Sequence, residues 1–139
     1  VDEMCEAQII PFQFRQLMQN LLGNALKFTV PERSPIITVK SRIVDGTELL
    51  HEKLSPQKKY CHISVCDNGI GFEPRFNKRI FEVFQRLHGR EAYQGTGIGL
   101  AIVKKIVENH NGIIAAKGMV NQGATFDIYI PHTETDMIA

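Results

Sequence analysis

The sequence predicts an α+β fold in which a mixed, mostly antiparallel sheet is covered on one face by helices. Two segments carry apolar residues at helical spacing, and four segments are β-branched or alternate in hydropathy, as strands do. Most of these strands follow one another as hairpins, which favours helices gathered on one face over a parallel sheet with helices on both. The chain has 139 residues, 43% of them hydrophobic, so we expect one domain over residues 1–139.

The first half of the chain predicts a helix followed by a hairpin. Apolar side chains recur at spacings of three and four from Phe12 to Phe28, which indicates an amphipathic helix. A stretch with two prolines ends it, and the β-branched segment from Ile36 to Val44 predicts a strand. Asp45-Gly46 is expected to be its turn, with a polar loop from Glu48 to Lys59. Alternation from Tyr60 to Cys66 predicts the second strand of the hairpin.

The second half predicts two helices and two closing strands. A short helix is expected around Asn77 to Phe84, followed by an exposed, mobile loop from Gln85 to Gly95. The apolar pattern returns in a helix from Gly99 to Asn109, which Asn111-Gly112 should end. The closing strands are expected at Ile113 to Val120 and Thr125 to Ile130, and the tail from His132 to Ala139 should be loose.

Composition excludes several classes of protein. Sixteen Lys and Arg against fifteen Asp and Glu leave a net charge of +1, so no general attraction to nucleic acid or to an anionic membrane is expected. The three cysteines form no CxxC pair, which argues against a disulfide framework or a zinc ribbon. No apolar stretch reaches the ~20 residues of a membrane span. Because the chain starts at Val1 without a signal peptide, we expect a cytoplasmic domain excised from a longer parent, which is either membrane-anchored or soluble.

Three polar residues share one face of the first predicted helix. Asn20, Asn24 and Lys27 lie at positions i, i+4 and i+7, and the opposite face is apolar. In one interpretation they are simply the polar side of an amphipathic helix. Asparagine, however, costs roughly half a kcal/mol relative to alanine inside a helix, so two of them one turn apart indicate a function. Carboxamide oxygens facing Mg²⁺, with Lys27 facing a phosphate, would supply one.

Two glycine-rich runs follow the hairpin. The first, Asp67-Asn68-Gly69-Ile70-Gly71, comes directly after a predicted strand. It can be an ordinary turn that needs no ligand. Alternatively, the glycines let the backbone pass a flat ring, while Asp67 accepts a hydrogen bond from an exocyclic amine such as that of adenine.

The second run opens the helix that starts at Gly99, and reads GTGIGL from Gly95 to Leu100. Backbone N–H groups at that helix end would point at an anion. The run is not a Walker motif, since no Gly-Lys-Ser/Thr follows, and a polar loop rather than a strand precedes it, unlike a dinucleotide fingerprint.

Together and in this order, the motifs resemble those of the catalytic ATP-binding domain of two-component sensor histidine kinases. This domain belongs to the GHKL superfamily, shared with gyrase, mismatch-repair ATPases and the large heat-shock chaperone. The resemblance covers nearly the whole chain and implies the Bergerat fold, a two-layer α/β sandwich. The segment QRLHGREAYQGTGIGL is similar to kinases that carry PAS, GAF or phytochrome sensory modules. The segments that look like the family's N, G1, F and G2 boxes and its closing strand are FRQLMQNLLGNALKFT (14–29), DNGIGF (67–72), IFEVFQRL (80–87), GTGIGLAIVKKIVENHNG (95–112) and GATFDIYIP (123–131).

The resemblance implies a site for ATP and Mg²⁺. Asn24 would be the main Mg²⁺ ligand, Asn20 would support it or touch the metal, and Lys27 would contact phosphate. Asp67 would read the adenine amino group. The remaining contacts would come from Gly69 and Gly71 beneath the ring, Thr125 through a water, and Arg86 with Gly95, Thr96, Gly97, Ile98, Gly99 and Leu100 over the phosphates. The ATP lid would run from about Phe76 to Gly95, with Phe81 and Phe84 as apolar anchors or, equally well, as plain core aromatics.

The resemblance also implies a reaction and its partners. The γ-phosphoryl group would pass to a histidine on a separate dimerisation domain of the same parent, with a response-regulator receiver domain downstream. Hydrolytic relatives, and Ser/Thr kinases of the anti-sigma type, carry Glu where Asn20 stands, and a carboxamide is no general base, so hydrolysis should be slow. We expect the isolated domain to be a monomer that does not label itself. An ATP-hydrolysing module and a non-catalytic nucleotide-binding module are the alternatives.

The histidines are interpreted as residues without a role as phospho-acceptor or metal ligand. His51 begins the segment HEKLSP, which imitates the family's phospho-acceptor motif. The acceptor, however, lies before the asparagine-bearing helix and on a long helix, whereas His51 follows that helix in a predicted loop. For His88, inside the lid, assistance in phosphate binding is one interpretation, and a solvated loop histidine is the favoured one. His62, His110 and His132 have no second ligand at metal spacing and are expected to be structural or surface groups.

Overall fold

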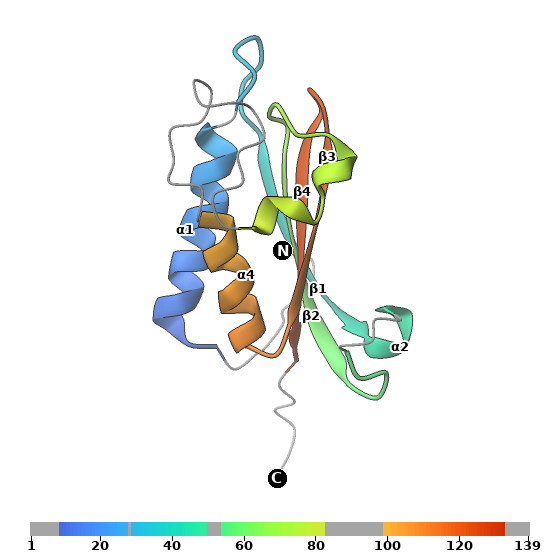
Figure 1. Ribbon diagram of the computed structural model, residues 1–139. Coiled ribbons are helices and arrows are strands. Elements are labelled where there is room, and N and C mark those ends of the chain that lie inside the picture. The colour runs from blue at the N-terminus through green and yellow to red at the C-terminus, as the bar shows by residue number, and fades with distance from the viewer. Residues whose placement is uncertain (1–8, 28, 50–53, 83–98, 133–139) are drawn as a thin grey trace.

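A computed structural model describes residues 9–27, 29–49, 54–82 and 99–132. Two long helices lie side by side on one face of a four-stranded sheet (Figure 1). The strand order is β1-β2-β4-β3, and every strand pair within the described residues is antiparallel. The predicted two-layer α+β fold is confirmed. Its elements are α1 (Pro11–Lys27), β1 (Ile37–Asp45), α2 (Gly46–Leu49), β2 (Lys59–Asp67), the 3₁₀ helices η1 (Pro74–Phe76) and η2 (Arg79–Phe81), α4 (Gly99–Asn109), β3 (Ile113–Met119) and β4 (Gly123–Pro131).

The hairpin of β1 and β2 places Asp67, a predicted site residue, at one end of the sheet. Ile37 at the start of β1 pairs with Asp67 at the end of β2, which confirms the predicted hairpin. β2 also pairs with β4, where Ala124 lies opposite Asp67. Asp67 therefore ends a central strand, flanked by β1 on one side and β4 on the other.

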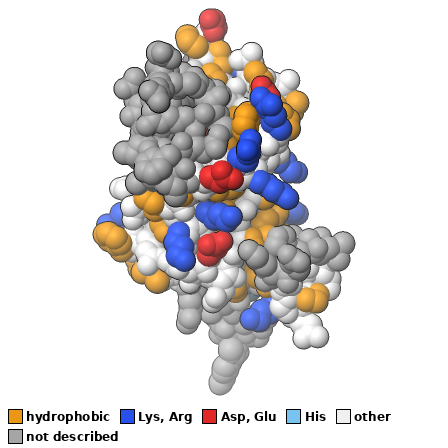
Figure 2. Space-filling model, viewed as in Figure 1, with side chains coloured by type: hydrophobic (Ala, Val, Ile, Leu, Met, Phe, Trp, Pro, Cys, Tyr) orange, Lys and Arg blue, Asp and Glu red, His pale blue; other side chains and the backbone are white. Residues whose placement is uncertain are grey.

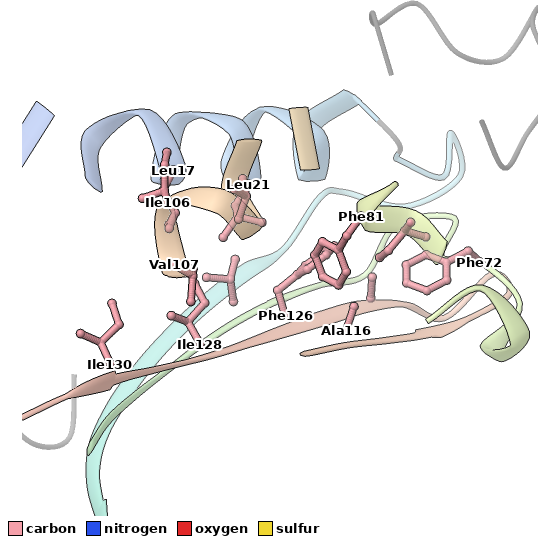
Figure 3. Packing of buried hydrophobic residues seen from close by; sticks show 14 residues of the cluster. Leu17, Leu21, Phe72, Phe81, Ile106, Val107, Ala116, Phe126, Ile128 and Ile130 are labelled. Atoms are coloured by element: carbon pink, nitrogen blue, oxygen red, sulfur yellow. The ribbon is translucent and has the colours of Figure 1, made fainter. Parts of the chain in front are cut away.

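The main core lies between the sheet and the pair formed by α1 and α4 (Figure 3). On α1, Leu17, Leu21 and Ala25 are buried at every fourth position, which forms one apolar stripe. On β4, Phe126 and Ile128 alternate with less buried residues, as expected of a strand with one covered face. This packing fixes which side of α1 faces the sheet and which side carries its polar residues.

The end of α4 confirms the stop signal predicted at Asn111-Gly112. Asn111 adopts a left-handed conformation with φ of 62°. The Gly112 N–H donates to the Val107 carbonyl at 3.0 Å, and the Asn111 N–H donates to the Glu108 carbonyl at 3.0 Å. These two bonds are those of a Schellman motif, with asparagine in the position that glycine most often takes.

The connection after β1 differs from the prediction. The strand β1 runs one residue further than predicted, to Asp45, and Gly46 begins the short helix α2 rather than completing a turn. The Gly46 N–H donates to the Lys58 carbonyl at 2.8 Å, and a Cβ on Gly46 would stand 1.9 Å from the Ser55 carbonyl oxygen. Glycine is therefore required because α2 folds back onto the far end of the same connection, a contact that no local turn signal reveals.

The helix predicted from Asn77 to Phe84 is replaced by η1 and η2. Pro74 begins η1 at the position where proline suits a helix start. In η2 the buried residues are the neighbours Ile80 and Phe81, which a single turn places against α4. Apolar residues that are adjacent rather than three or four apart favour short turns over a longer helix. Residues 83 and 84 lie outside the described residues, as do the predicted loop from Gln85 to Gly95 and the tail after His132.

The surface of the described residues carries both signs of charge. Basic and acidic side chains lie next to one another on the face seen in Figure 2, in keeping with the net charge of +1. Within the described ranges, no helix combines the length and the apolar character that crossing a bilayer would require.

Candidate functional site

The polar side of α1 meets the first residue of α4. The Asn20 carboxamide Nδ2 donates to the Gly99 carbonyl, with 3.4 Å between the two heavy atoms. Asn24 lies one helical turn further along α1, is half-buried like Asn20, and precedes the exposed Lys27. The structure thus brings the predicted carboxamides and the start of α4 to one end of the helical layer.

The first residues of α4 are only partly buried. Apart from its chain neighbours and its own helix backbone, no atom of the described residues lies within 4 Å of the position that a Cβ on Gly99 would occupy. The N–H groups of the first helical turn, including that of Leu100, have no partner within the helix itself. The rest of the predicted phosphate turn, from Gly95 to Ile98, lies outside the described residues, and so does Arg86.

Asp67 is held by its own turn on the helix-covered side of the sheet. Val65, two residues earlier on β2, belongs to the main core, and residues i and i+2 of a strand share a face. The Asp67 Oδ1 accepts a hydrogen bond from the Gly69 N–H at 2.8 Å. Burial raises the pKa of the Asp67 carboxyl above its ordinary value of 3.8, while the N–H groups of Gly69 and Ala124 oppose that shift. The result is a partly desolvated acceptor with a fixed orientation.

Gly71 has a packing role that the sequence did not indicate. Its φ is +64°, and a Cβ there would stand 2.1 Å from the Met119 carbonyl oxygen and 2.6 Å from that of Gly123. The absence of a side chain lets the turn after Asp67 press against the turn between β3 and β4. This close approach accounts for Gly71 by itself, and its predicted place beneath a ring stays a prediction, as does that of the buried Gly69.

Thr125 lies on the other face of the sheet from Asp67. It pairs with Cys66, and its Oγ1 donates to the Cys66 Sγ at 3.3 Å, whereas Asp67 and Phe126 point toward the helices. This placement is at odds with the predicted shared contact to adenine. The sequence already indicated this placement. Thr125 and Phe126 are neighbours on a strand, so if Phe126 faces the helices, Thr125 faces the opposite side of the sheet. Ala124 is the β4 residue that lies opposite Asp67 and on its face.

The described histidines are structural, as expected. His110 Nδ1 lies 2.7 Å from the Ile106 carbonyl and its Nε2 accepts the Ile10 N–H at 2.9 Å, which assigns the proton to Nδ1. His62 Nε2 lies 2.8 Å from the Asp127 Oδ1, and the ring nitrogen Nδ1 of His132 lies 3.7 Å from the Cys61 Sγ.

No three metal-ligating side chains of His, Cys, Asp or Glu gather within the described part of the chain. His51 and His88 lie outside it. Phe81 packs edge-on against Phe126, with ring centroids 6.2 Å apart, so it belongs to the core, and Phe84 is not described.

Two residues around Asp67 escaped the sequence analysis. Asn68 and Arg33 hold the turn after β2 through hydrogen bonds to segments distant in sequence. An asparagine in an Asp-Asn-Gly run looks like ordinary turn chemistry, and an arginine in a proline-rich connection carries no motif.

Comparison with known proteins places the chain in a family. Residues 10–134 match the family described as "Histidine kinase-, DNA gyrase B-, and HSP90-like ATPase". Cyanobacterial phytochrome A of Nostoc sp. is 46% identical over 119 residues, which cover 86% of this chain and 14% of that protein. The circadian input-output histidine kinase CikA of Synechococcus elongatus is 36% identical over 123 residues, which cover 87% of this chain and 14% of that protein. The chain thus spans a small part of either relative.

Solved structures agree with this assignment. The catalytic domain of the histidine kinase ThkA is 25% identical with a TM-score of 0.65, and the match covers 92% of this chain and 73% of that one. Full-length ShkA in complex with AMPPNP is 29% identical with a TM-score of 0.66, and the match covers 88% of this chain and 22% of that one. The chain therefore belongs to the histidine kinase-, DNA gyrase B- and HSP90-like ATPases, as an ATP-binding domain of the sensor histidine kinase type.

Proposed function

We propose that this domain binds ATP together with Mg²⁺ and donates the γ-phosphoryl group to a histidine on a separate dimerisation domain of the same parent protein. A response-regulator receiver domain would be the next acceptor. The observation that carries the proposal is the arrangement of Asp67 and Asn20. A partly buried carboxyl group ends β2 on the face covered by α1 and α4, and a carboxamide of α1 meets the start of α4. The family match and the AMPPNP complex of the similar kinase ShkA support it.

Asp67 suits recognition of the adenine base. Ionised, it only accepts hydrogen bonds, so it favours an exocyclic amine and disfavours the carbonyl that guanine presents in the same position. Its Oδ1 is oriented by the Gly69 N–H at 2.8 Å. Because the carboxyl is partly desolvated, a hydrogen bond to it would be worth more than the same bond in water.

The α1 face suits the metal and the phosphates. Oxygen is the ligand atom that Mg²⁺ prefers, and Mg²⁺ usually binds through one or two protein groups plus substrate phosphates. Asn24 and Asn20 can each offer a carboxamide oxygen, and since Asn20 Nδ2 is directed at Gly99, its Oδ1 points elsewhere. The ion would neutralise phosphate charge. Lys27 and the N-terminus of α4 would add positive charge beside the phosphates.

The identity of residue 20 argues for transfer to an external nucleophile. A carboxamide has no useful basicity near neutral pH, so Asn20 cannot activate water for hydrolysis. What remains is positioning of ATP and neutralisation of its charge, which suits transfer to an imidazole brought from outside. A hydrolytic ATPase of the same superfamily is therefore disfavoured.

The test is a labelling experiment with γ-labelled ATP and Mg²⁺. The 139-residue chain alone should stay unlabelled, whereas a dimerisation domain that carries the acceptor histidine should become labelled when both are mixed. The same acceptor domain with its histidine replaced by glutamine is the control. Label on His51 of this chain, or phosphate release at the same rate with and without the acceptor, would contradict the proposal.

A further inference from the structure

Arg33 lies where three turns from distant parts of the sequence meet. These are the segment 33–36 after α1, the turn 67–71 after β2, and the turn 119–123 between β3 and β4. One guanidinium nitrogen, Nη2, donates to the Gly69 carbonyl at 3.4 Å and also to the Asn121 carbonyl. A single side chain from the first turn thus bridges the other two.

Asn68 ties the first two turns together in the opposite direction. Its Oδ1 accepts the Ile36 N–H at 2.9 Å, and its Nδ2 donates to the Ser34 carbonyl at 3.0 Å. Its own N–H donates to the Ile36 carbonyl at 3.3 Å. The segment that carries Arg33 is therefore itself fixed against the turn that follows Asp67.

The turn between β3 and β4 also contacts the turn 67–71. The Asn121 N–H donates to the Ile70 carbonyl at 2.7 Å. Gly123, with φ of +114°, lies so close to β2 that a Cβ on it would stand 1.9 Å from the Asp67 carbonyl oxygen. The peptide groups that follow Asp67 and Ile70 are consequently restrained. Between them lies Gly69, whose N–H orients the Asp67 carboxylate.

We infer that Arg33 is a positioning residue, which holds the turn 67–71 so that the Asp67 carboxylate points toward the amino group of adenine. This inference rests on the proposed function and adds a residue that acts on base selectivity. A planar guanidinium can serve two carbonyl groups at once, whereas a lysine ammonium is a point charge on a flexible stem. Arg33 is exposed and belongs to neither hydrophobic cluster, so its loss should affect the turn and leave the core intact.

The experiment compares ATP and GTP binding to the chain by calorimetry in the presence of Mg²⁺. Arg33→Met removes the donors and keeps the length of the side chain, and Arg33→Lys keeps the charge. Arg42→Met is the matched control, because Arg42 is also exposed but donates to His62 Nδ1 across β1 and β2 at 3.3 Å, on the face opposite Asp67. Melting temperatures of all variants are measured alongside.

We expect Arg33→Met to weaken ATP binding about tenfold, which is about 1.4 kcal/mol and the low end for hydrogen bonds to a charged group. GTP binding should change little, so the preference for ATP shrinks. Arg33→Lys should restore only part of that preference, and Arg42→Met should match the wild type. Hydrogen exchange at the Asn121 amide should accelerate in Arg33→Met, while the amides that join β2 and β4 stay protected.

Two outcomes would overturn the inference. One is an unchanged ratio of ATP to GTP affinity in Arg33→Met; the other is a parallel loss of both affinities with a lowered melting temperature, which marks a merely structural residue. Failure of the proposed function looks different: the wild-type chain itself would bind neither nucleotide, or would bind both equally. In that case the exchange rate at Asn121 still decides whether Arg33 holds the turn.

Discussion

The same substitution, glycine to alanine, should have opposite effects on stability at two positions. At Gly71 the backbone is left-handed with φ of +64°, a conformation that costs an alanine roughly 1–2 kcal/mol. The added Cβ would also stand 2.1 Å from the Met119 carbonyl oxygen, so the turn between β3 and β4 must shift. Overpacking of this kind typically lowers stability by about 1–3 kcal/mol. Gly71→Ala should therefore lower the free energy of unfolding by about 2–5 kcal/mol, a large part of the roughly 5–15 kcal/mol of a typical domain.

At Gly23 the expected sign is reversed. Gly23 is exposed within α1. Apart from its chain neighbours and the backbone of α1, no atom of the described residues lies within 4 Å of the position its Cβ would take. An alanine there reduces the freedom of the unfolded chain and suits the helix, so Gly23→Ala should raise stability by about 0.4–1 kcal/mol.

Urea titrations followed by circular dichroism measure both free energies. In thermal unfolding, at about 3 °C per kcal/mol for a domain of this size, Gly71→Ala should melt about 6–15 °C below the wild type. The Gly23→Ala variant controls for any general response to an added methyl group. A Gly71→Ala protein within about 0.5 kcal/mol of the wild type, the range typical of neutral surface changes, would refute the close approach of the two turns.

Three further predictions concern the proposed site. Asp67→Asn should weaken ATP binding at least about tenfold. Its melting temperature should equal or exceed that of the wild type, because burial already disfavours the charged form of the carboxyl group. A melting temperature lowered as far as that of Gly71→Ala would contradict this prediction. ATP affinity of the wild type, titrated calorimetrically from neutral to acidic pH, should fall as pH drops through the raised pKa of Asp67. With a raised folded pKa, the folded chain holds that proton more tightly than the unfolded chain does, so protonation of Asp67 itself favours folding, and binding should be lost while the fold persists. Asn24→Ala should abolish the enhancement of ATP binding by Mg²⁺; an enhancement equal to that of the wild type would exclude Asn24 as a ligand.

Regular elements were predictable because their signals are local. The apolar spacing in α4 and the Asn111-Gly112 pair set its bounds, which are those observed. β1 and β2 came within a residue or two for the same reason, since alternation and β-branching are read from neighbours in the sequence.

The remaining features depend on contacts between distant segments. Gly46 needs to be glycine because of Ser55, and Gly71 because of Met119, and neither contact has a signature within a short window of sequence. Arg33 escaped notice because its two acceptors are carbonyls of residues 69 and 121, which only the folded sheet brings together. Thr125 was misplaced for another reason: its role was carried over from a resemblance, although the alternation with Phe126 already pointed it the other way.

The hydrogen bond between Ile10 and His110 indicates where the domain can be immobilised on a sensor surface without covering the proposed site. This bond joins the N-terminus of α1 to the C-terminus of α4. The His132 N–H likewise donates to the carbonyl of Lys59, the first residue of β2. Gly99 lies ten residues before Asn109, the last residue of α4, and is therefore about 15 Å away from it along the helix axis. A tether or a dye joined near Ile10 or His132 therefore sits remote from Gly99 and Asp67, and a chip-based titration with nucleotide can be run without masking either.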